Sequence, residues 1–430
     1  MASLNIAYIG GGSTRAPGTV ASFILQGENF KGSTITLIDQ HQDRLELVGH
    51  LARKMAAAHG TDIRICTTTN LEKGLRDANA VLSSFRPGGF EARFLDESIP
   101  LKYGVIGQET QGPGGFFMAL RSIKVIKHIV ALMEKVASKA TLFNYTNPVN
   151  IVAQAVRDYS SVPVISLCEG PIVFPQELVS RVGLDPKKLE TIMIGLNHAC
   201  WSTEHLYKGE DVMPLLEEKL ETLQQSNADK ETLRRLELAV TMRSIPASYM
   251  NYYYYRDEIL QELQAKPTTR ARDIMAAVPD YWQHYEEQAQ QDNPVLEPER
   301  SRGGIFELEL AVDVMDSFFN DKKEVWTLNV PNRGAIAGMP QGRVVEVPCV
   351  VGKNQITPLV SGSLPAPVRG LVGALGEYQE LTARAAWEEN KHVALQALVS
   401  NPLVPSLEIA KELYKEMSIA HADYLPEGLR

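Results

Sequence analysis

The chain has 430 residues, of which 44% are hydrophobic and 22% are charged, and its formal net charge is −9. This ordinary globular composition predicts a large buried core, and the acidic balance argues against nucleic acid or an anionic membrane as the main partner. The four cysteines lack a CxxC pair, no apolar run is long enough to span a membrane, and the first residues lead directly into a strand pattern, so we expect a cytoplasmic enzyme.

Strand and helix patterns alternate through the first 200 residues, beginning with an apolar strand at residues 4–9 and a glycine turn. Periodicity predicts further strands at residues 33–39, 62–69, 78–85, 140–146, 163–168 and 191–198, and helices at 17–25, 43–59, 122–138 and 149–160. This alternation is typical of a doubly wound parallel sheet. We therefore predict an α/β, Rossmann-like domain over residues 1–200.

The pattern becomes helix-rich after residue 200. A charged helical stretch covers residues 215–239, two more follow at 251–263 and 270–278, and the last 60 residues are mostly helical. Short strand patterns interrupt them at residues 325–332 and 342–351. We expect residues 201–430 to form a helix-rich catalytic and oligomerisation domain that packs on the first.

The glycine turn lies between a strand and a helix, which is the context that a dinucleotide-binding fingerprint requires. Its candidate cofactor contacts are Gly10, Gly11, Gly12, Ser13 and Thr14. Asp39 ends the second strand, where an acid accepts from a ribose hydroxyl and favours NAD over NADP. Arg15 takes the place of the usual third glycine, and we expect its charge near the pyrophosphate or an anionic group of the substrate. The alternative is a tight turn without a ligand.

Four polar side chains follow three later strands of the predicted sheet. Cys168 and Glu169 come at the end of one strand, His198 at the end of another, and Asn147 follows a third. Because ligands bind at the carboxyl ends of such strands, a thiolate and an imidazole here suit a borderline metal with open positions for substrate. From spacing alone, a buried cysteine and a capping histidine remain common structural residues.

Two further stretches have unusual compositions. Residues 104–116 contain five glycines around Gln108, Glu109 and Thr110, which indicates either a connecting loop or a substrate-holding loop. Residues 249–255 contain five tyrosines, most of which we expect in the core. One of them could act as a base if a cation lowered its pKa.

Taken together, these stretches resemble the family 4 glycoside hydrolases, which are NAD- and metal-dependent glycosidases. The resemblance covers nearly the whole chain in the family's order, and its segments are GGGSTRAPG, IPLKYGVIGQETQGPGGF, NYTNPVNIV, SLCEGP, GLNHACW, IPASYMNYYYY, TTRARDIM and the later RGG and EVPC. It implies a sheet like that of the lactate and malate dehydrogenases, and a homodimer or homotetramer.

The resemblance also implies a mechanism that departs from the usual pair of catalytic carboxylates. In this family NAD⁺ takes hydride from C3 of the sugar, the C2 proton is removed, the aglycone is eliminated, water adds, and the hydride returns. A divalent metal, usually Mn²⁺, binds the C2 and C3 oxygens.

Residue by residue, the resemblance assigns Cys168 and His198 as metal ligands and Tyr249 as the base for the C2 proton. Glu109 and Asn147 match residues that contact the sugar hydroxyls and the metal region. Arg270 matches an arginine that binds a 6-phosphate, a role that suits its planar fork, and Arg86 is a second candidate for the same pocket.

Glu169 departs from the family pattern, in which asparagine after the metal cysteine resembles β-specific phosphoglucosidases and aspartate resembles α-specific ones. A carboxyl there fits an acid for the leaving oxygen and favours α-glycosides slightly, although the segments around residues 99–116 and 267–275 look equally like β-type enzymes. The histidine that usually follows the cysteine in branches acting on unphosphorylated sugars or uronides is missing here. We therefore expect a 6-phosphoglucosidase, with α and β nearly level.

Two other classes of function remain open from the sequence. An NAD-dependent 2-hydroxy acid dehydrogenase would share the sheet, but its His–Asp pair and carboxylate-binding arginine cannot be placed in this chain. A nucleotide sensor without catalysis would bind NAD but leave the metal, base and phosphate positions unexplained.

Overall fold

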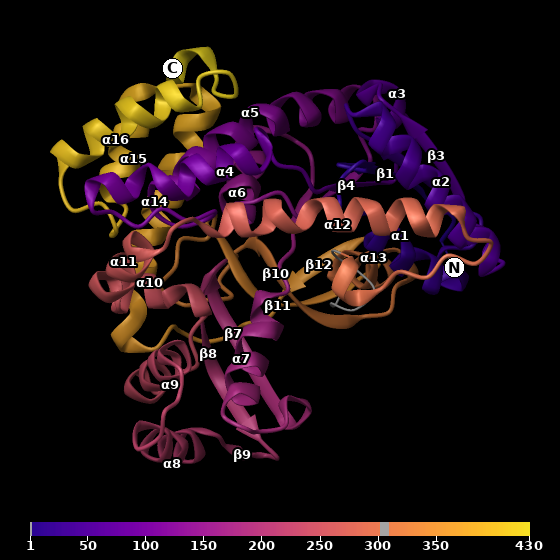
Figure 1. The fold of residues 1–430 in the computed structure, drawn as a ribbon. Coiled ribbons are helices and arrows are strands. Elements are labelled where there is room, and N and C mark those ends of the chain that lie inside the picture. Colours follow the sequence, from indigo (N-terminus) through magenta and orange to yellow (C-terminus); the bar gives the residue numbers. More distant parts are fainter. Residues whose placement is uncertain (1, 302–308) are drawn as a thin grey trace.

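A mixed sheet of twelve strands runs through the described part of the chain, residues 2–301 and 309–430 of this computed structural model (Figure 1). The strand order is β3-β2-β1-β4-β5-β6-β10-β11-β7-β8-β9, and β12 pairs with β11. The strands are β1 (Asn5–Ile9), β2 (Thr34–Ile38), β3 (Arg64–Thr68), β4 (Ala80–Ser83), β5 (Thr141–Asn144), β6 (Val164–Ser166), β7 (Leu189–Leu196), β8 (Ala199–Tyr207), β9 (Glu210–Asp211), β10 (Glu324–Pro331), β11 (Val344–Gly352) and β12 (Gln355–Pro358).

Strands β1 to β6 are parallel and form most of the sheet predicted for residues 1–200. The strand predicted at residues 191–198 is β7, which pairs antiparallel with β8 and β11 and so does not belong to the parallel half. The chain moves from β1 to β3 in one direction and from β4 to β6 in the other, so right-handed crossovers place the connecting helices on opposite faces. Accordingly, α1 packs against α2, whereas α5 packs against α3 and α6. The predicted Rossmann-like α/β fold is confirmed, with its switch point between β1 and β4.

The helices of this half differ from the prediction mainly around residues 89–121 and at residues 170–181, where α7 was not predicted. Helix α5 begins ten residues before the predicted start at residue 122, because Gly114 and Gly115 let the loop at residues 107–111 fold directly onto the helix. A Cβ on Gly115 would lie 2.3 Å from the backbone of Thr110. The helices are α1 (Ala16–Leu25), α2 (Gln42–Ala58), α3 (Leu71–Leu75), α4 (Gly89–Ser98), α5 (Gly112–Val136), α6 (Val149–Tyr159) and α7 (Gly170–Arg181), with 3-10 turns η1 (Gly27–Phe30), η2 (Pro100–Tyr103) and η3 (Pro186–Lys188).

Residues beyond 200 contribute both helices and strands. The charged stretch at residues 215–239 is two helices rather than one, since Asp229 caps the second by accepting from the amide of Thr232. The elements are α8 (Met213–Gln224), α9 (Lys230–Met242), α10 (Asn251–Tyr254), α11 (Arg256–Ala265), α12 (Arg270–Gln290), α13 (Leu310–Asn320), α14 (Arg369–Glu388), α15 (Lys391–Ser400) and α16 (Leu407–Ala420), with 3-10 turns η4 (Ser248–Met250), η5 (Pro298–Arg300), η6 (Ala366–Val368) and η7 (Glu427–Leu429).

The sheet is shared by the two halves of the chain. Strand β10 pairs antiparallel with β6 through Asn329 and Ser166, and β11 connects β10 to β7. Helices α14 to α16 pack beside α4, α5 and α6, while α12 lies along α2 and α4 (Figure 1). The division at residue 200 stays a prediction. The RGG segment of the family resemblance, residues 302–304, lies outside the described residues.

The sheet core positions the site by fixing where its strands end. Every residue of β4 and β5 is buried, because helices cover both faces of these central strands. The carboxyl ends of the parallel strands therefore meet at one edge. The residues that follow the strand ends at this edge include the glycine loop, Asp39, Arg86, Asn147 and Cys168.

In the described ranges, none of the helices is long and apolar enough to cross a membrane.

Candidate active site

The glycine loop is fitted closely to the strands on either side of β1. Gly10 and Gly11 both donate their amides to the carbonyl of Ile38, at 2.9 and 3.1 Å. Gly10 has φ +95°, and a Cβ there would lie 2.0 Å from the oxygen of Ser84. The glycines are thus required by the loop's own packing. The loop leads into α1, whose first turn has no acidic residue, so its N-terminus suits a phosphate group.

Asp39 stands where the sequence places it and also holds the loop. Its Oδ2 accepts from the amide of Gly12 at 3.0 Å, and its Oδ1 accepts from the amide of His41 at 3.1 Å. Tyr285 of α12 supports the same loop by donating to the carbonyl of Thr14 at 2.7 Å. The predicted cofactor residues of the glycine loop and Asp39 therefore form one connected unit at the edge of the sheet.

Cys168 and His198 lie side by side although they come from different strand ends. The Sγ of Cys168 is 3.5 Å from the Nε2 of His198, and the amide of Gly170 lies 3.4 Å from the same sulfur. His198 occupies the hairpin turn between β7 and β8 with φ +61°, which is uncommon for a residue with a side chain. The Oγ1 of Thr110 lies 2.7 Å from His198 Nδ1 and fixes the ring, which leaves Nε2 directed at the thiol.

This pair fits a divalent metal by both geometry and chemistry. Two ligand atoms at about 2.3 and 2.1 Å from a tetrahedral metal are about 3.6 Å apart, close to the observed separation. Burial lowers the pKa of His198 to about 4, so its imidazole is neutral and able to bind a metal. Burial raises the pKa of the Cys168 thiol. No third His, Cys, Asp or Glu joins them among the described residues, which leaves positions for substrate oxygens.

Tyr249 packs directly on this pair. Its ring stacks on that of His198, with centroids 3.9 Å apart and planes 14° from parallel, and Phe174 meets both rings edge-on. Burial raises the pKa of Tyr249, and the charge of Glu109 raises it further, whereas the charge of Arg93 lowers it. The predicted base therefore lies beside the predicted metal ligands and within the field of one cation.

Glu109 is held by two arginines. Arg86 binds its Oε1 and Arg93 binds its Oε2 at 2.7 Å, while Asn147 donates to Oε1 at 3.3 Å. Burial alone would raise the pKa of this carboxyl, but the two guanidinium groups outweigh it and lower the pKa to about 2. Glu109 is therefore a fixed anion, and Arg86 contacts it rather than an open surface.

A cavity of about 460 Å³ opens beside Tyr249, a size that suits a small ligand. Arg270, at the start of α12, lines it together with Lys266, Thr268 and Thr269. Two other lining cations are already bound: Arg93 by Glu97 and Glu109, and Arg234 by Glu262 in a bidentate pair. Arg270 and Lys266 have no ion-pair partner among the described residues, so they are available to an anionic group.

Glu169 points away from the cavity side, towards the glycine loop. Its Oε1 is 3.0 Å from Nη2 of Arg15, and the same Nη2 is 3.7 Å from the carboxylate of Glu309. The guanidinium of Arg15 also lies over the ring of Tyr145, 4.8 Å from its centroid. Arg15, expected near the pyrophosphate or an anionic group of the substrate, is thus surrounded by two carboxylates and an aromatic ring.

Sequence reasoning missed three charged residues around this site. Arg93 lies in the middle of α4 and Glu97 in its last turn, and the short amphipathic pattern of this helix gives no sign of a role for either. Glu346 of β11 is fully buried and accepts from Asn197 and Asn329, both at 3.0 Å, so it holds the turn that carries His198. The EVPC segment of the family resemblance was the available signal for Glu346.

Comparison with known proteins places the chain among glycosidases. A model described as "Family 4 glycosyl hydrolase" matches residues 5–184, and one described as "Family 4 glycosyl hydrolase C-terminal domain" matches residues 193–404. A "Probable 6-phospho-beta-glucosidase" of Bacillus subtilis is 35% identical over 99% of this chain and 98% of its own length. The "Phospho-alpha-glucosidase PagL" of Clostridium acetobutylicum is 31% identical over 99% of this chain and 100% of its own.

Solved structures give the same result. The 6-phospho-beta glucosidase from Thermotoga maritima, solved with manganese, NAD⁺ and glucose-6-phosphate, has a TM-score of 0.83 and 29% identity over 98% of this chain and 99% of its own. The malate dehydrogenase of Cryptosporidium parvum, with a TM-score of 0.55 and 15% identity over 90% of this chain and all of its own, shares the fold alone. The predicted likeness to the dehydrogenase sheet is confirmed.

Proposed function

The chain belongs to the family 4 glycosyl hydrolases, and from this premise we propose that it hydrolyses 6-phosphoglucosides with NAD⁺ and a divalent metal, Mn²⁺ by preference. It is a glycosidase, and its relatives include both 6-phospho-α- and 6-phospho-β-glucosidases. One observation carries the proposal for the site. Cys168, His198 and Tyr249 are in continuous contact, and Tyr249 also lines the cavity that contains Arg270.

The glycine loop and the N-terminus of α1 would hold the pyrophosphate of NAD⁺, with Asp39 beside the ribose. Asp39 already uses one lone pair of each oxygen to fix the loop, and a carboxylate retains further acceptor capacity for a hydroxyl. When bound, NAD⁺ and the metal would supply hydride transfer at C3 and Lewis-acid polarisation of the sugar oxygens. The chain's own residues orient the sugar and move its protons.

Tyr249 is the proposed base for the C2 proton. Its raised pKa keeps the phenol protonated at neutral pH unless positive charge lies close by. The stacked position on His198 would place the phenol beside a cation bound by Cys168 and His198, and Arg93 adds its field from the other side. Glu109, fixed as an anion, and Asn147, 3.3 Å from it, are placed to contact the sugar hydroxyls.

The cations that line the cavity support a phosphorylated substrate. Arg270 and Lys266 lie with the hydroxyls of Thr268 and Thr269 at the N-terminus of α12. The amide of Ala271 in the first turn of α12 already donates to Glu97 at 2.8 Å, so the two cations carry the argument. A guanidinium and an ammonium together suit a phosphate dianion better than a neutral sugar. The alternative is a family member acting on unphosphorylated sugars or uronides.

The geometry of the site supports a choice between α- and β-glycosides less directly than it supports a 6-phosphate. Glu169 as an acid for the leaving oxygen would favour α-glycosides, but its carboxylate is bound to Arg15 on the cofactor side. We therefore propose α- and β-glycosides as nearly equal candidate substrates, with α-glycosides slightly favoured.

One set of assays tests the proposal. Purified protein is incubated with nitrophenyl α- and β-glucosides, with and without a 6-phosphate, in the presence and absence of NAD⁺ and Mn²⁺. We expect hydrolysis of a 6-phosphoglucoside only when both NAD⁺ and Mn²⁺ are present, without net formation of NADH. Hydrolysis after complete chelation of metal, or of unphosphorylated glucosides alone, would contradict the proposal. Steady accumulation of NADH would indicate a dehydrogenase instead.

We also propose a cytoplasmic location, a homodimer or homotetramer, and a boundary near residue 200 between a cofactor domain and a helix-rich catalytic domain. Cell fractionation, light scattering and limited proteolysis test these three statements in turn. A monomer in light scattering would contradict the second.

A further inference from the structure

Two residues that depart from the usual sequence patterns meet in the structure. Arg15 stands at the place of the third glycine of the cofactor loop, and Glu169 follows the proposed metal ligand Cys168. They are 154 positions apart in the chain, yet their side chains form an ion pair at 3.0 Å. Neither residue has a role in the family resemblance that explains this contact.

The ion pair crosses the sheet edge at the place where ligands bind. Arg15 is the N-cap residue of α1, after β1, and Glu169 is the N-cap residue of α7, after β6. Two strands, β4 and β5, lie between β1 and β6, so the strand ends are about 14 Å apart. Two long side chains are needed to join them, and the link passes over the carboxyl ends of β4 and β5.

Several neighbouring groups hold the Arg15–Glu169 pair, so its two side chains have little conformational freedom. Only 28% of the Arg15 side chain and 21% of the Glu169 side chain are exposed to solvent. The Tyr145 ring lies under the guanidinium, and the Tyr145 hydroxyl accepts from the amide of Ala311 at 2.9 Å. Glu309, which accepts from the hydroxyl of Thr19 of α1 at 3.2 Å, lies 3.7 Å from Nη2 of Arg15 and adds a second anionic contact. A partly buried, multiply contacted ion pair transmits position better than an exposed one.

The backbone at the Glu169 end is equally constrained. The carbonyl of Glu169 accepts from the amides of Ile172 and Val173, each at 2.9 Å, and the amide of Gly170 lies 3.4 Å from the Cys168 sulfur. The position of the Glu169 side chain is therefore tied to that of the Cys168 thiol. At the other end, Arg15 continues the loop whose amides face the cofactor site.

From this geometry we propose that the Arg15–Glu169 pair is a positioning link that couples cofactor binding to metal binding. Ordering the Cys168 loop by a divalent metal fixes Glu169, Glu169 fixes Arg15, and Arg15 fixes the glycine loop. Each ligand thereby raises the affinity for the other, and by linkage the two factors are equal. The proposal rests on the proposed function only in that NAD⁺ and Mn²⁺ are the two ligands.

Calorimetric titration of the purified full-length protein tests the link without any assay of activity. The dissociation constant for NAD⁺ is measured with saturating Mn²⁺ and after chelation, for the wild type and for the R15M, E169Q and R15M/E169Q variants. We expect Mn²⁺ to tighten NAD⁺ binding in the wild type by roughly 5- to 20-fold, within the usual range for coupled sites. In each variant the ratio should fall to near 1, and the double variant should fall no further than the single ones.

Two more variants make the result specific. R15K should keep part of the coupling, because an ammonium still reaches one carboxylate. R384M removes an i,i+4 ion pair with Glu388 on the surface of α14 and should keep the full wild-type ratio.

The results that would overturn this proposal differ from the result that would contradict the proposed function. An unchanged ratio in R15M or E169Q, or no coupling in the wild type, overturns the proposal. Weaker NAD⁺ binding in R15M by the same factor with and without Mn²⁺ also overturns it, because Arg15 would then contact the cofactor directly. If R15M does not fold, E169Q, which removes only one charge, decides the question. Failure of the wild type to bind NAD⁺ or Mn²⁺ at all would instead contradict the proposed function.

Discussion

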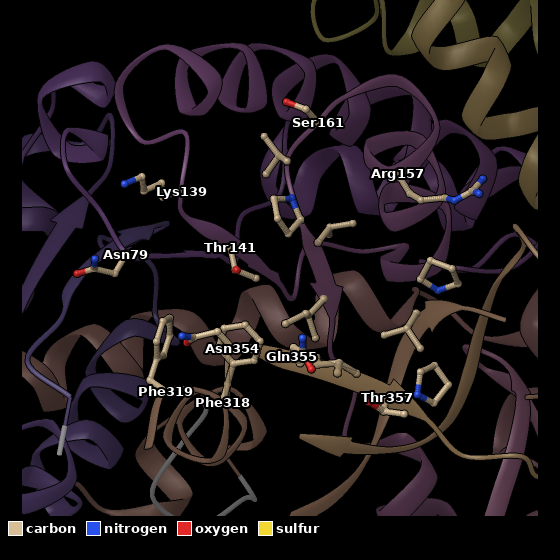
Figure 2. Close-up of a pocket in the computed structure, with 18 of the residues that line it drawn as sticks. Asn79, Lys139, Thr141, Arg157, Ser161, Phe318, Phe319, Asn354, Gln355 and Thr357 are labelled. Atoms are coloured by element: carbon tan, nitrogen blue, oxygen red, sulfur yellow. The ribbon is translucent and has the colours of Figure 1, made fainter. Parts of the chain in front are cut away.

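At the amino ends of β4, β5 and β6 the structure has a second depression, of about 960 Å³, which is larger than the 460 Å³ cavity beside Tyr249 (Figure 2). Both contain several cations. At the amino edge, Lys139 and Arg157 lie on opposite sides of the depression, and Arg157 contacts only the neighbouring Asp158 among the described carboxylates (Figure 2). At the carboxyl edge, Arg93 is buried between Glu97 and Glu109.

This contrast indicates that the arrangement of charge identifies the site better than the volume of the cavity. An exposed cation is solvated, keeps many conformations and contributes little to stability. A buried ion pair carries a desolvation penalty that a fold bears only where the geometry is closely compensated, and such groups concentrate at functional sites. At the carboxyl edge Arg93 and Glu109 are largely buried and bound to each other, whereas Lys139 and Arg157 at the amino edge are exposed and lie apart.

The largest expected effect comes from removing a proposed metal ligand. C168S or H198A should reduce hydrolysis of a 6-phosphoglucoside by at least about 10⁴-fold, because the charge developing at C2 loses its Lewis acid. K139A, at the other edge, should leave kcat/KM within about twofold. Initial rates with saturating NAD⁺ and Mn²⁺ measure both. NAD⁺ binding by C168S confirms that the fold persists, and appreciable activity in that variant would place the metal elsewhere.

The next effect tests the base. Y249F removes the phenolic oxygen and keeps the ring that stacks on His198, so kcat should fall by about 10²- to 10³-fold with KM little changed. Exchange of the C2 hydrogen with deuterated water, followed by NMR, should stop in the variant. Y253F is a matched control, because Tyr253 belongs to the same run of tyrosines and its hydroxyl already donates to Gln111 at 2.7 Å. Continued exchange in Y249F would exclude the tyrosine as the base.

The sequence was informative wherever the signal is local. Alternating apolar patterns predicted the parallel strands, and the residues after each strand end, such as Asp39, Asn147 and Cys168, could be assigned to one edge by topology alone. The glycine loop was recognisable because its glycines are required by backbone geometry at Gly10.

The sequence did not predict the contacts that join distant segments of the chain. Nothing in the periodicity of residues 325–351 says that β10 pairs with β6, because strand pairing depends on tertiary packing rather than on local pattern. The same holds for Arg93, which becomes part of the site only because α4 packs against the loop of Glu109. It holds also for Arg15, whose partner lies across the sheet. The role of a side chain that acts through a distant partner can be assigned only when the fold shows which residue that partner is.

A smaller effect is expected from arginines that have no ion-pair partner within the described part of the chain, and one such arginine at each edge can be compared. R270A should raise KM for 6-phosphoglucosides by about 10- to 100-fold, since a charge-assisted contact contributes about 1.5–3 kcal/mol, and should change KM for unphosphorylated glucosides little. R333A removes an arginine that lines the depression at the amino edge and should change neither value. Steady-state kinetics on matched substrates give the ratio. Equal losses on both substrates would mean that Arg270 supports the fold rather than a phosphate.

The smallest expected effect concerns stability at the carboxyl edge. Burial raises the pKa of Glu309 to about 7, although Arg15 opposes this. Below pH 4.5 the carboxyl is protonated in the folded and unfolded states alike and has no net effect. Between pH 4.5 and 7 only the unfolded state ionises, so the free energy of unfolding decreases, and above pH 7 the loss reaches at most about 3 kcal/mol.

E309Q removes this ionisation and should therefore increase the free energy of unfolding relative to wild type by about 1–3 kcal/mol more at pH 8 than at pH 5. Urea unfolding at the two pH values measures the difference. E210Q, at an exposed position of β9, controls for the loss of one negative charge from an acidic chain. If E309Q destabilises more at pH 8 than at pH 5, Glu309 is an anion that Arg15 requires. Arg15 would then be held by the carboxylates of both Glu309 and Glu169 rather than by Glu169 alone.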